Sequence, residues 1–208
     1  MGHGVDPVNC FFVQGFGGVV FEANRSLEKD LRASLGHLAS KIDIIMEPAE
    51  PETVNDRLER ALALQGISKK DLDIIKVDVD GLDCHLVQAL TASGWRPKLW
   101  HVEVNPLFPP RVALWPQALS ASVTTKQQDL TSAFSRRISG KQTLVGCSLQ
   151  ALLDAAGSEY VLVQLEFENA VLVRKDLSEG LEPWLSSRSV VRALGGLQGH
   201  KITWTLVL

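Results

Sequence analysis

Runs of aliphatic and β-branched residues recur along the first half of the chain, at residues 19–22, 41–46, 74–79 and 98–104. The run at 74–79 has isoleucine or valine at four positions, which are Ile74, Ile75, Val77 and Val79. Apolar runs of this kind are typical of strands that are covered on both faces of a parallel sheet. The pattern therefore predicts four buried strands, and the run at 74–79 is expected to be central.

Segments with helical spacing of their apolar residues separate these runs. Three of them, each followed by a glycine that can end a helix, are residues 27–35, 53–64 and 82–92. The pair Asp6-Pro7 predicts the start of another helix at 8–13. The strict alternation of strand and helix through residue 105 predicts an α/β fold with a parallel sheet and covering helices.

The pattern loosens after residue 105. Four prolines and a polar stretch without periodicity predict a long loop or lid over residues 106–146. A helix at 148–157 follows, and then two strands at 160–167 and 170–174 that a tight turn can join. These two strands predict an antiparallel hairpin late in the chain.

Composition and charge narrow the classes of protein. The 208 residues are 45% hydrophobic and 22% charged, as is ordinary for a globular chain, and the net charge is −3. This charge provides no basic footprint for nucleic acid, and no apolar run approaches the roughly 20 residues of a membrane-spanning helix. We expect neither a nucleic-acid partner nor a membrane span.

The three cysteines, Cys10, Cys84 and Cys147, are far apart and form no C-x-x-C motif. An odd number of cysteines without a regular framework predicts free thiols that serve as small core residues. Free thiols indicate a reducing compartment, which favours the cytoplasm.

Polar residues follow two neighbouring strands of the predicted sheet. The strand at 74–78 continues into the motif V-D-V-D-G-L-D at 77–83, which contains Asp78 and Asp80. The strand at 98–104 is followed by Asn105 and contains Glu103 near its end. Open α/β sheets bind their ligands at the carboxyl ends of the strands. The sequence therefore predicts a binding or catalytic site at this edge of the sheet.

The order of four motifs resembles the FkbM-like class I methyltransferases, which use S-adenosylmethionine. The motifs are G-F-G-G-V-V-F-E-A-N, V-D-V-D-G-L-D, H-V-E-V-N-P and a late N-A-V-L-V-R segment, and the similarity covers roughly residues 2–175. The resemblance implies a Rossmann-like, seven-stranded sheet whose last two strands form the hairpin. It also implies methyl transfer, which we expect to reach an oxygen of an acceptor that the sequence does not identify.

The resemblance assigns the cofactor to residues at the ends of the early strands: Gly2, Gly4, Glu22, Glu47, Ala49 and Asp78. The two glycines match a loop where a side chain would block the approach of the backbone to the cofactor. Glu22 would accept hydrogen bonds from the ribose hydroxyls, because a carboxylate can accept two such bonds. Glu47 to Ala49 would lie beside the adenine, and Asp78 near the methionine end.

Four residues form the pool of candidate catalytic bases: Asp78, Asp80, His101 and Glu103. Alternation along the strand places His101 and Glu103 on one face and Trp100 on the other. His101 has a suitable pKa for a base, although a histidine packed beneath a helix fits the same position. Lys76 lies within an apolar strand and is expected to pair with a nearby carboxylate.

The acids also have other interpretations. Asp78 or Asp80 with Glu103 and Asn105 could bind Mg²⁺ through oxygen ligands, although we assign no metal. A calcium loop is rejected, because lysine and valine stand where that loop needs acids. In a purely structural role, Asp80 would cap the turn at Gly81 and Asp83 would cap the following helix.

One departure from the family concerns the first strand, which precedes the glycine motif and is central in the sheet. The sequence has no strand before Met1, so either it is a fragment or another strand replaces the first one, and residues 202–207 are the spare candidate. We assign residues 1–175 to a methyltransferase-like domain and 176–208 to an extension that packs on it. The alternative is a non-catalytic relic or interaction domain on the same scaffold. A dinucleotide-binding protein of the NAD type is disfavoured, since no G-x-G-x-x-G joins a strand to a helix.

Overall fold

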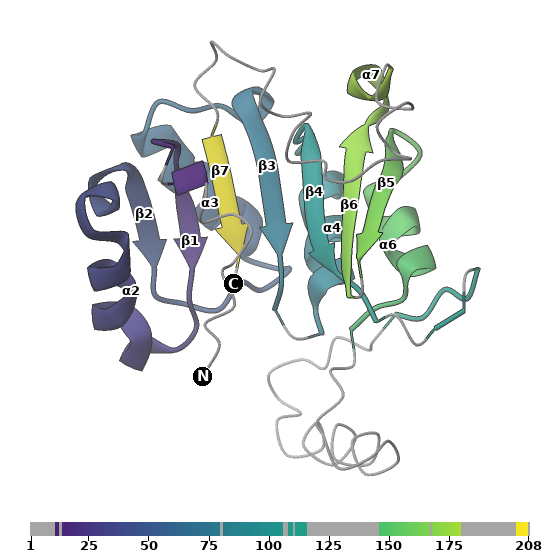
Figure 1. The fold of residues 1–208 in the computed structure, drawn as a ribbon, viewed down its shortest axis with the longest axis horizontal. Coiled ribbons are helices and arrows are strands. Elements are labelled where there is room, and N and C mark those ends of the chain that lie inside the picture. The colour runs from purple at the N-terminus through teal and green to yellow at the C-terminus, as the bar shows by residue number, and fades with distance from the viewer. Residues whose placement is uncertain are drawn as a thin grey trace.

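The computed structural model describes residues 11–12, 14–79, 81–105, 108–109, 111–115, 146–166, 168–179 and 203–207, the last of these as backbone only. These described residues form a mixed α/β structure around one sheet of seven strands (Figure 1), in the order β2-β1-β7-β3-β4-β6-β5. The strands are β1 (Gly17–Phe21), β2 (Ile42–Ile45), β3 (Leu72–Val77), β4 (Leu99–Glu103), β5 (Tyr160–Glu166), β6 (Asn169–Arg174) and β7 (Thr203–Val207).

Strand β7 is the last element in sequence but lies in the middle of the sheet. It runs parallel to β1 on one side and to β3 on the other, and Thr205 is opposite both Val19 and Ile75. The prediction that a strand near 202–207 takes the central place is therefore confirmed. Its presence provides backbone partners for both neighbouring strands, whose N–H and C=O groups would otherwise be buried without them.

The late hairpin also forms as predicted. Strand β6 is antiparallel to both β4 and β5, which makes it the reversed strand of the sheet. The helices alternate with the earlier strands at the predicted places. They are α2 (Glu28–Leu35), α3 (Val54–Leu64), α4 (Asp83–Ala92), α6 (Leu149–Ala156) and the short α7 (Lys175–Ser178), with 3₁₀ turns at Arg25–Leu27, Gly36–Lys41 and Lys69–Asp71.

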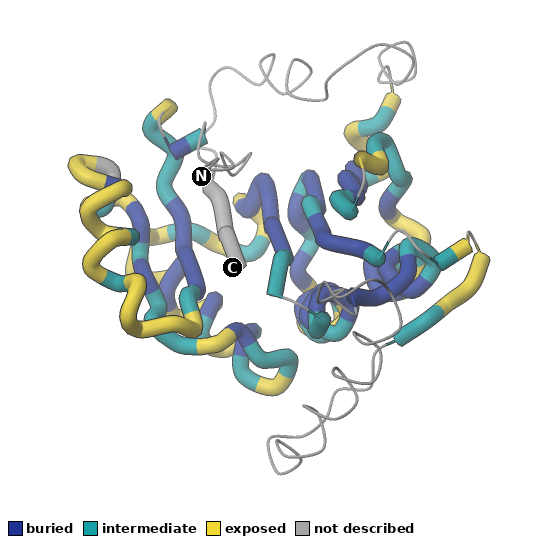
Figure 2. Tube along the Cα trace, turned by 60° about the horizontal axis from the view of Figure 1, so that its bottom comes forward, coloured by how far each residue is buried: buried dark blue, intermediate teal, exposed yellow. Residues whose placement is uncertain are grey.

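The sheet separates two hydrophobic clusters. Helices α3, α4 and α6 lie on one face of the sheet, behind it in Figure 1, and pack on the larger cluster, which includes the fully buried Trp95 and Trp100. The smaller cluster, with Leu35, Ile42 and Ile74, is on the other face near α2. Figure 2 shows β1 and β3 buried and α2 largely exposed. Both faces of the sheet therefore carry buried apolar side chains.

The cysteines depart from the prediction. Cys84, in the first turn of α4, forms a disulfide with Cys147, just before α6, across a sequence separation of 63 residues. Both residues are fully buried. The expectation of free thiols is wrong for this pair, and the argument for a reducing compartment no longer holds. The pairing depends on how α4 packs against α6, which the spacing of cysteines in the sequence does not reveal. Cys10 lies outside the described residues.

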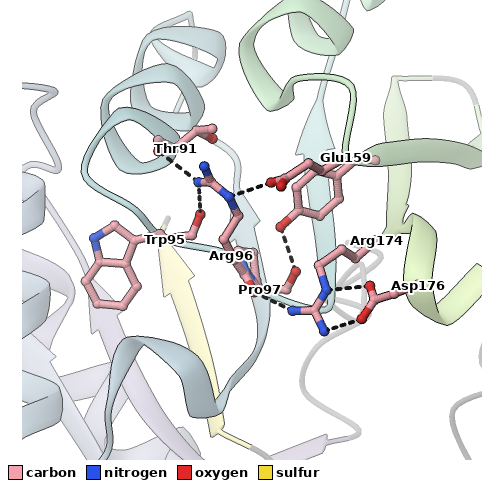
Figure 3. A network of polar contacts seen from close by, with 8 residues as sticks. Thr91, Trp95, Arg96, Pro97, Glu159, Arg174 and Asp176 are labelled. Carbon is pink, nitrogen blue, oxygen red and sulfur yellow. Dashed lines mark hydrogen bonds and ion pairs between the residues drawn. The ribbon is translucent and has the colours of Figure 1, made fainter.

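A polar network fixes the hairpin at the amino end of β4, opposite the candidate site (Figure 3). Arg174 makes a two-pronged contact with Asp176, with Nε–Oδ1 and Nη2–Oδ2 distances of 2.6 and 3.0 Å, and donates from Nη1 to the carbonyl of Arg96. Arg96 in turn forms an ion pair with Glu159. The Tyr160 hydroxyl donates to the Pro97 carbonyl at 2.7 Å. These contacts tie β6 and β5 to the start of β4.

Replacement of Tyr160 by phenylalanine is expected to lower the free energy of unfolding by about 1 kcal/mol, because a buried hydrogen bond is lost. Burial raises the pKa of Tyr160 to about 12. The folded protein therefore binds this proton more tightly than the unfolded chain, and the associated stability is present below pH 10 and lost as the pH rises towards 12. Tyr160→Phe should remove that alkaline dependence. Because the chain has one tyrosine, tyrosinate absorbance follows this group alone.

Candidate active site at the carboxyl edge of the sheet

The register of the strands brings several polar residues to one edge. Val207 of β7 is opposite both Phe21 of β1 and Val77 of β3. Glu22 directly follows Phe21, and Asp78 directly follows Val77. These two acids are thus separated by one intervening strand, a spacing of about 10 Å between backbones. Both acids therefore lie at the carboxyl ends of strands on either side of β7.

Glu22 is partly buried and already holds the turn that follows β1. Its Oε1 accepts a hydrogen bond from the backbone N–H of Asn24 at 2.6 Å, and its own N–H donates to the carbonyl of Ile45 in β2. Asn24 then accepts from the N–H and the hydroxyl of Ser26. This chain of contacts fixes the direction of the Glu22 carboxylate at the end of its strand.

The segment after β2, residues 47–49, makes its contacts with α3 and with the hydrophobic core. The carboxylate of Glu47 forms a 2.9 Å ion pair with Arg57 of α3, and Arg57 also donates to the carbonyl of Pro48. Ala49 is buried in the larger hydrophobic cluster, together with Val54. Glu47 therefore lies at the surface beside α3, while the side chain of Ala49 forms part of the core.

Lys76 and Asp78 form an ion pair at the end of β3. The distance between Nζ and Oδ2 is 3.0 Å, and the lysine side chain is 5% exposed against 37% for the aspartate. The predicted carboxylate partner of Lys76 is thereby identified. Lys76 is also opposite His101 in the β3–β4 register. A buried cation, an acid and a histidine are thus neighbours on adjacent strands.

His101 and Glu103 lie on β4 as alternation predicts. Trp100 and Val102 belong to the larger cluster beneath the helices, whereas Leu99, which has the parity of His101 and Glu103, belongs to the smaller one. The two polar residues therefore face away from α3, α4 and α6. Glu103 is 5% exposed and is opposite Asn169 of β6. The register places Asp78 and Glu103 at the carboxyl ends of adjacent strands, with His101 two residues earlier on the same face of β4.

The loop between β3 and α4 depends on Asp83, whose role the sequence analysis missed. Asp83 is fully buried, and its carboxylate accepts from the N–H of Val79 at Oδ1 and from that of Gly81 at Oδ2, both at 3.0 Å. The alternative interpretation, in which Asp83 has the purely structural role of capping the helix, is wrong. Leu82 is the N-cap of α4 and makes no side-chain capping bond. The side chain of Asp83 turns back to the preceding loop because buried backbone N–H groups need acceptors.

Burial raises the pKa of Asp83, although its hydrogen bonds with Val79 and Gly81 act in the opposite direction. Gly81 has a φ of +124°, a conformation that residues with a side chain rarely adopt. The glycine of the V-D-V-D-G-L-D motif is therefore required by the path of the loop. Asp80, Gly2 and Gly4 lie outside the described residues.

The first turn of α4 also connects with the segments that follow β4. The Cys84–Cys147 disulfide is next to Asp83, and the N–H of Asn105 donates to the carbonyl of Cys147 at 2.8 Å. The ring of His85 contacts that of Trp115 edge to face, with centroids 5.6 Å apart. Burial lowers the pKa of His85, while the charge of Glu52 opposes this effect. Asp83, Cys84 and His85 thus connect α4 with the β3–α4 loop and with Trp115 and Cys147, which follow β4 in the sequence.

Within the part of the chain that the structure describes, no group of three or more histidine, cysteine, aspartate or glutamate side chains could hold a metal ion. In the same residues, no helix is both long enough and apolar enough to cross a membrane. The fold and the polar edge define a mixed α/β protein with a candidate site at the carboxyl ends of its central strands. Comparisons of the chain with family models, curated proteins and solved structures found no match.

Proposed function

We propose that this chain binds S-adenosylmethionine at the carboxyl edge of its sheet and transfers the methyl group to an oxygen of an acceptor. The observation that carries the proposal is the place of β7, parallel to its neighbours and between β1 and β3. In the class I methyltransferases that the sequence resembles, the first strand occupies this place. In this chain β7 occupies that place instead. The late hairpin of β5 and β6 lies beside β4, where the resemblance implies it.

The acids on either side of β7 fit the two ends of the cofactor. Glu22 uses Oε1 to hold the N–H of Asn24, and a carboxylate has further lone pairs with which to accept the ribose hydroxyls. Asp78 would attract the positively charged methionine end, with its direction set by Lys76. Gly2 and Gly4 would allow close approach of the backbone, and the loop from Glu47 would border the adenine.

S-adenosylmethionine supplies a methyl group on a positively charged sulfur, which reacts with an aligned nucleophile. The residues of the chain must hold the acceptor and take up its proton. His101 and Glu103 face the same side of β4, and Asp78 lies at the end of the neighbouring strand. With Asp80 they form the pool of bases, and histidine is the side chain that enzymes use most often as a general base.

Calorimetric titration tests the cofactor site directly. We expect micromolar binding of S-adenosylmethionine and S-adenosylhomocysteine to the unmodified chain. Glu22→Ala should weaken both by about tenfold or more, because hydrogen bonds to a charged acceptor contribute about 1.5–3 kcal/mol each. Glu28→Ala is the matched control, since it removes an exposed glutamate whose partner is Arg32 in the same helix.

Failure to bind either compound, in a protein whose urea unfolding is cooperative, would reject the proposal and favour a non-catalytic scaffold. Equal loss in Glu22→Ala and Glu28→Ala would contradict the assignment of Glu22. Binding that survives in both variants would place the cofactor elsewhere on the molecule.

A further inference from the structure

The β3–α4 loop is held from beneath by a single buried carboxylate. Asp83 accepts hydrogen bonds from the backbone N–H groups of Val79 and Gly81. Its two carboxylate oxygens therefore bind the loop at two positions that are two residues apart in the sequence. Val79 directly follows Asp78, the acid that we place at the cofactor. The position of Asp83 therefore determines the path of the backbone on which Asp78 stands.

The arrangement is costly for stability. Removing a carboxylate from water is unfavourable, and burial, together with the nearby charge of Asp78, raises the pKa of Asp83. The side chains that follow on the same helix, Leu86 and Val87, are apolar and fully buried. An apolar residue at 83 would fill such a site at lower cost but would leave two loop N–H groups without their acceptor. Local costs of this kind are expected at functional sites.

The residue after Asp83, Cys84, anchors the first turn of α4 through a disulfide. Cys84 is bonded to Cys147, and the carbonyl of Cys147 accepts from the N–H of Asn105, which comes two residues after Glu103. Asp83 thus holds the loop after β3, and Cys84 is linked to the loop after β4. One turn of helix therefore sets the two loops of the site relative to one another.

We infer that Asp83 is a positioning residue of the site, which orients Asp78 for its ligand by fixing the backbone at residues 79 and 81. The inference rests on the proposed function in its reference to the ligand. Its structural part, the control of Asp78 by Asp83, can be tested without any ligand. The ion pair between Lys76 and Asp78 supplies the readout, because the ammonium of Lys76 is buried against that carboxylate.

The experiment compares the unmodified chain with Asp83→Asn, which has nearly the same shape but can accept at only one of its two terminal atoms. Amide hydrogen exchange should accelerate by about tenfold or more at Val79 or Gly81, as expected for the loss of one charge-assisted hydrogen bond. The NMR signal of the Lys76 ammonium should shift towards the position that it has in Asp78→Asn, the variant in which the ion pair is absent. Affinity for S-adenosylhomocysteine should fall by about tenfold, whereas Asp83→Glu should recover part of each effect.

Asp154→Asn is the control, because Asp154 is exposed on α6 and accepts from Gln150 of the same helix. Unchanged exchange or an unchanged Lys76 signal in folded Asp83→Asn would overturn the inference, whether or not the ligand binds. A changed loop with unchanged affinity would also overturn it. If the unmodified chain binds no S-adenosylhomocysteine, the proposed function fails, and amide exchange together with the Lys76 signal decides whether Asp83 positions Asp78.

Discussion

Replacement of both Cys84 and Cys147 by alanine is expected to lower the free energy of unfolding by about 4 kcal/mol. The disulfide closes a loop with a sequence separation of 63 residues, and the chain-entropy model gives roughly this value for a loop of that length. The bond restricts the unfolded chain, while in the folded protein it joins α4 to the segment before α6. Urea unfolding, with and without a dithiol reductant such as dithiothreitol, measures the effect.

Cys10→Ala is the matched control, because it removes a cysteine and leaves the disulfide intact. We expect its unfolding midpoint to match that of the unmodified chain under oxidising conditions. The reductant should lower the urea midpoint of the unmodified chain and of Cys10→Ala, but not that of the variant in which Cys84 and Cys147 are both alanine. If thiol labelling of the denatured, unreduced protein found three reactive cysteines, Cys84 and Cys147 would not be bonded and the prediction would be contradicted.

The disulfide also illustrates what local sequence patterns can and cannot predict. Strands β3 and β4 were predictable because their β-branched and apolar residues satisfy a local rule about burial. The pairing of Cys84 with Cys147 depends on two helices that meet through the packing of the whole core. Cysteine spacing contains no information about that contact, so counting cysteines led to the wrong chemical state.

Some features of the candidate site likewise followed from local sequence patterns, whereas others depend on the tertiary structure. The carboxylate partner of Lys76 was predictable, because a lysine within a buried strand requires a nearby opposite charge. The face of His101 followed from alternation along β4. For Asp83 the sequence offered a helix cap as an alternative, because its spacing suits a cap, but its actual hydrogen bonds depend on the path of the loop, which is a tertiary property. The glycine at 81 was a signal that the loop follows an unusual path, because its φ is positive.

The central place of β7 was predictable only by an argument about the complete sheet. Nothing in residues 203–207 distinguishes a central strand from an edge strand. The need for a partner between β1 and β3, whose buried N–H and C=O groups must be paired, made the late strand a candidate. The strand order then confirmed that long-range requirement.

Thr205→Pro is expected to lower the free energy of unfolding by about 3 kcal/mol or more. Thr205 is in the middle of β7 and is opposite Val19 of β1 and Ile75 of β3. Proline has no N–H to donate, and its ring is not accommodated within a central strand. The variant should either unfold at a much lower urea concentration or fail to fold cooperatively.

Thr205→Ala is the control, because alanine keeps the backbone N–H and differs from threonine by about 1 kcal/mol or less in strand preference. A chain in which β7 is central must therefore respond far more strongly to proline than to alanine. Equal unfolding midpoints for the two variants would remove β7 from between β1 and β3. Glu22 and Asp78 would then no longer be held on either side of a common strand, and the geometric support for the cofactor site would be lost with it. The Thr205 pair of variants thus tests the fold and the premise of the proposed function in a single comparison.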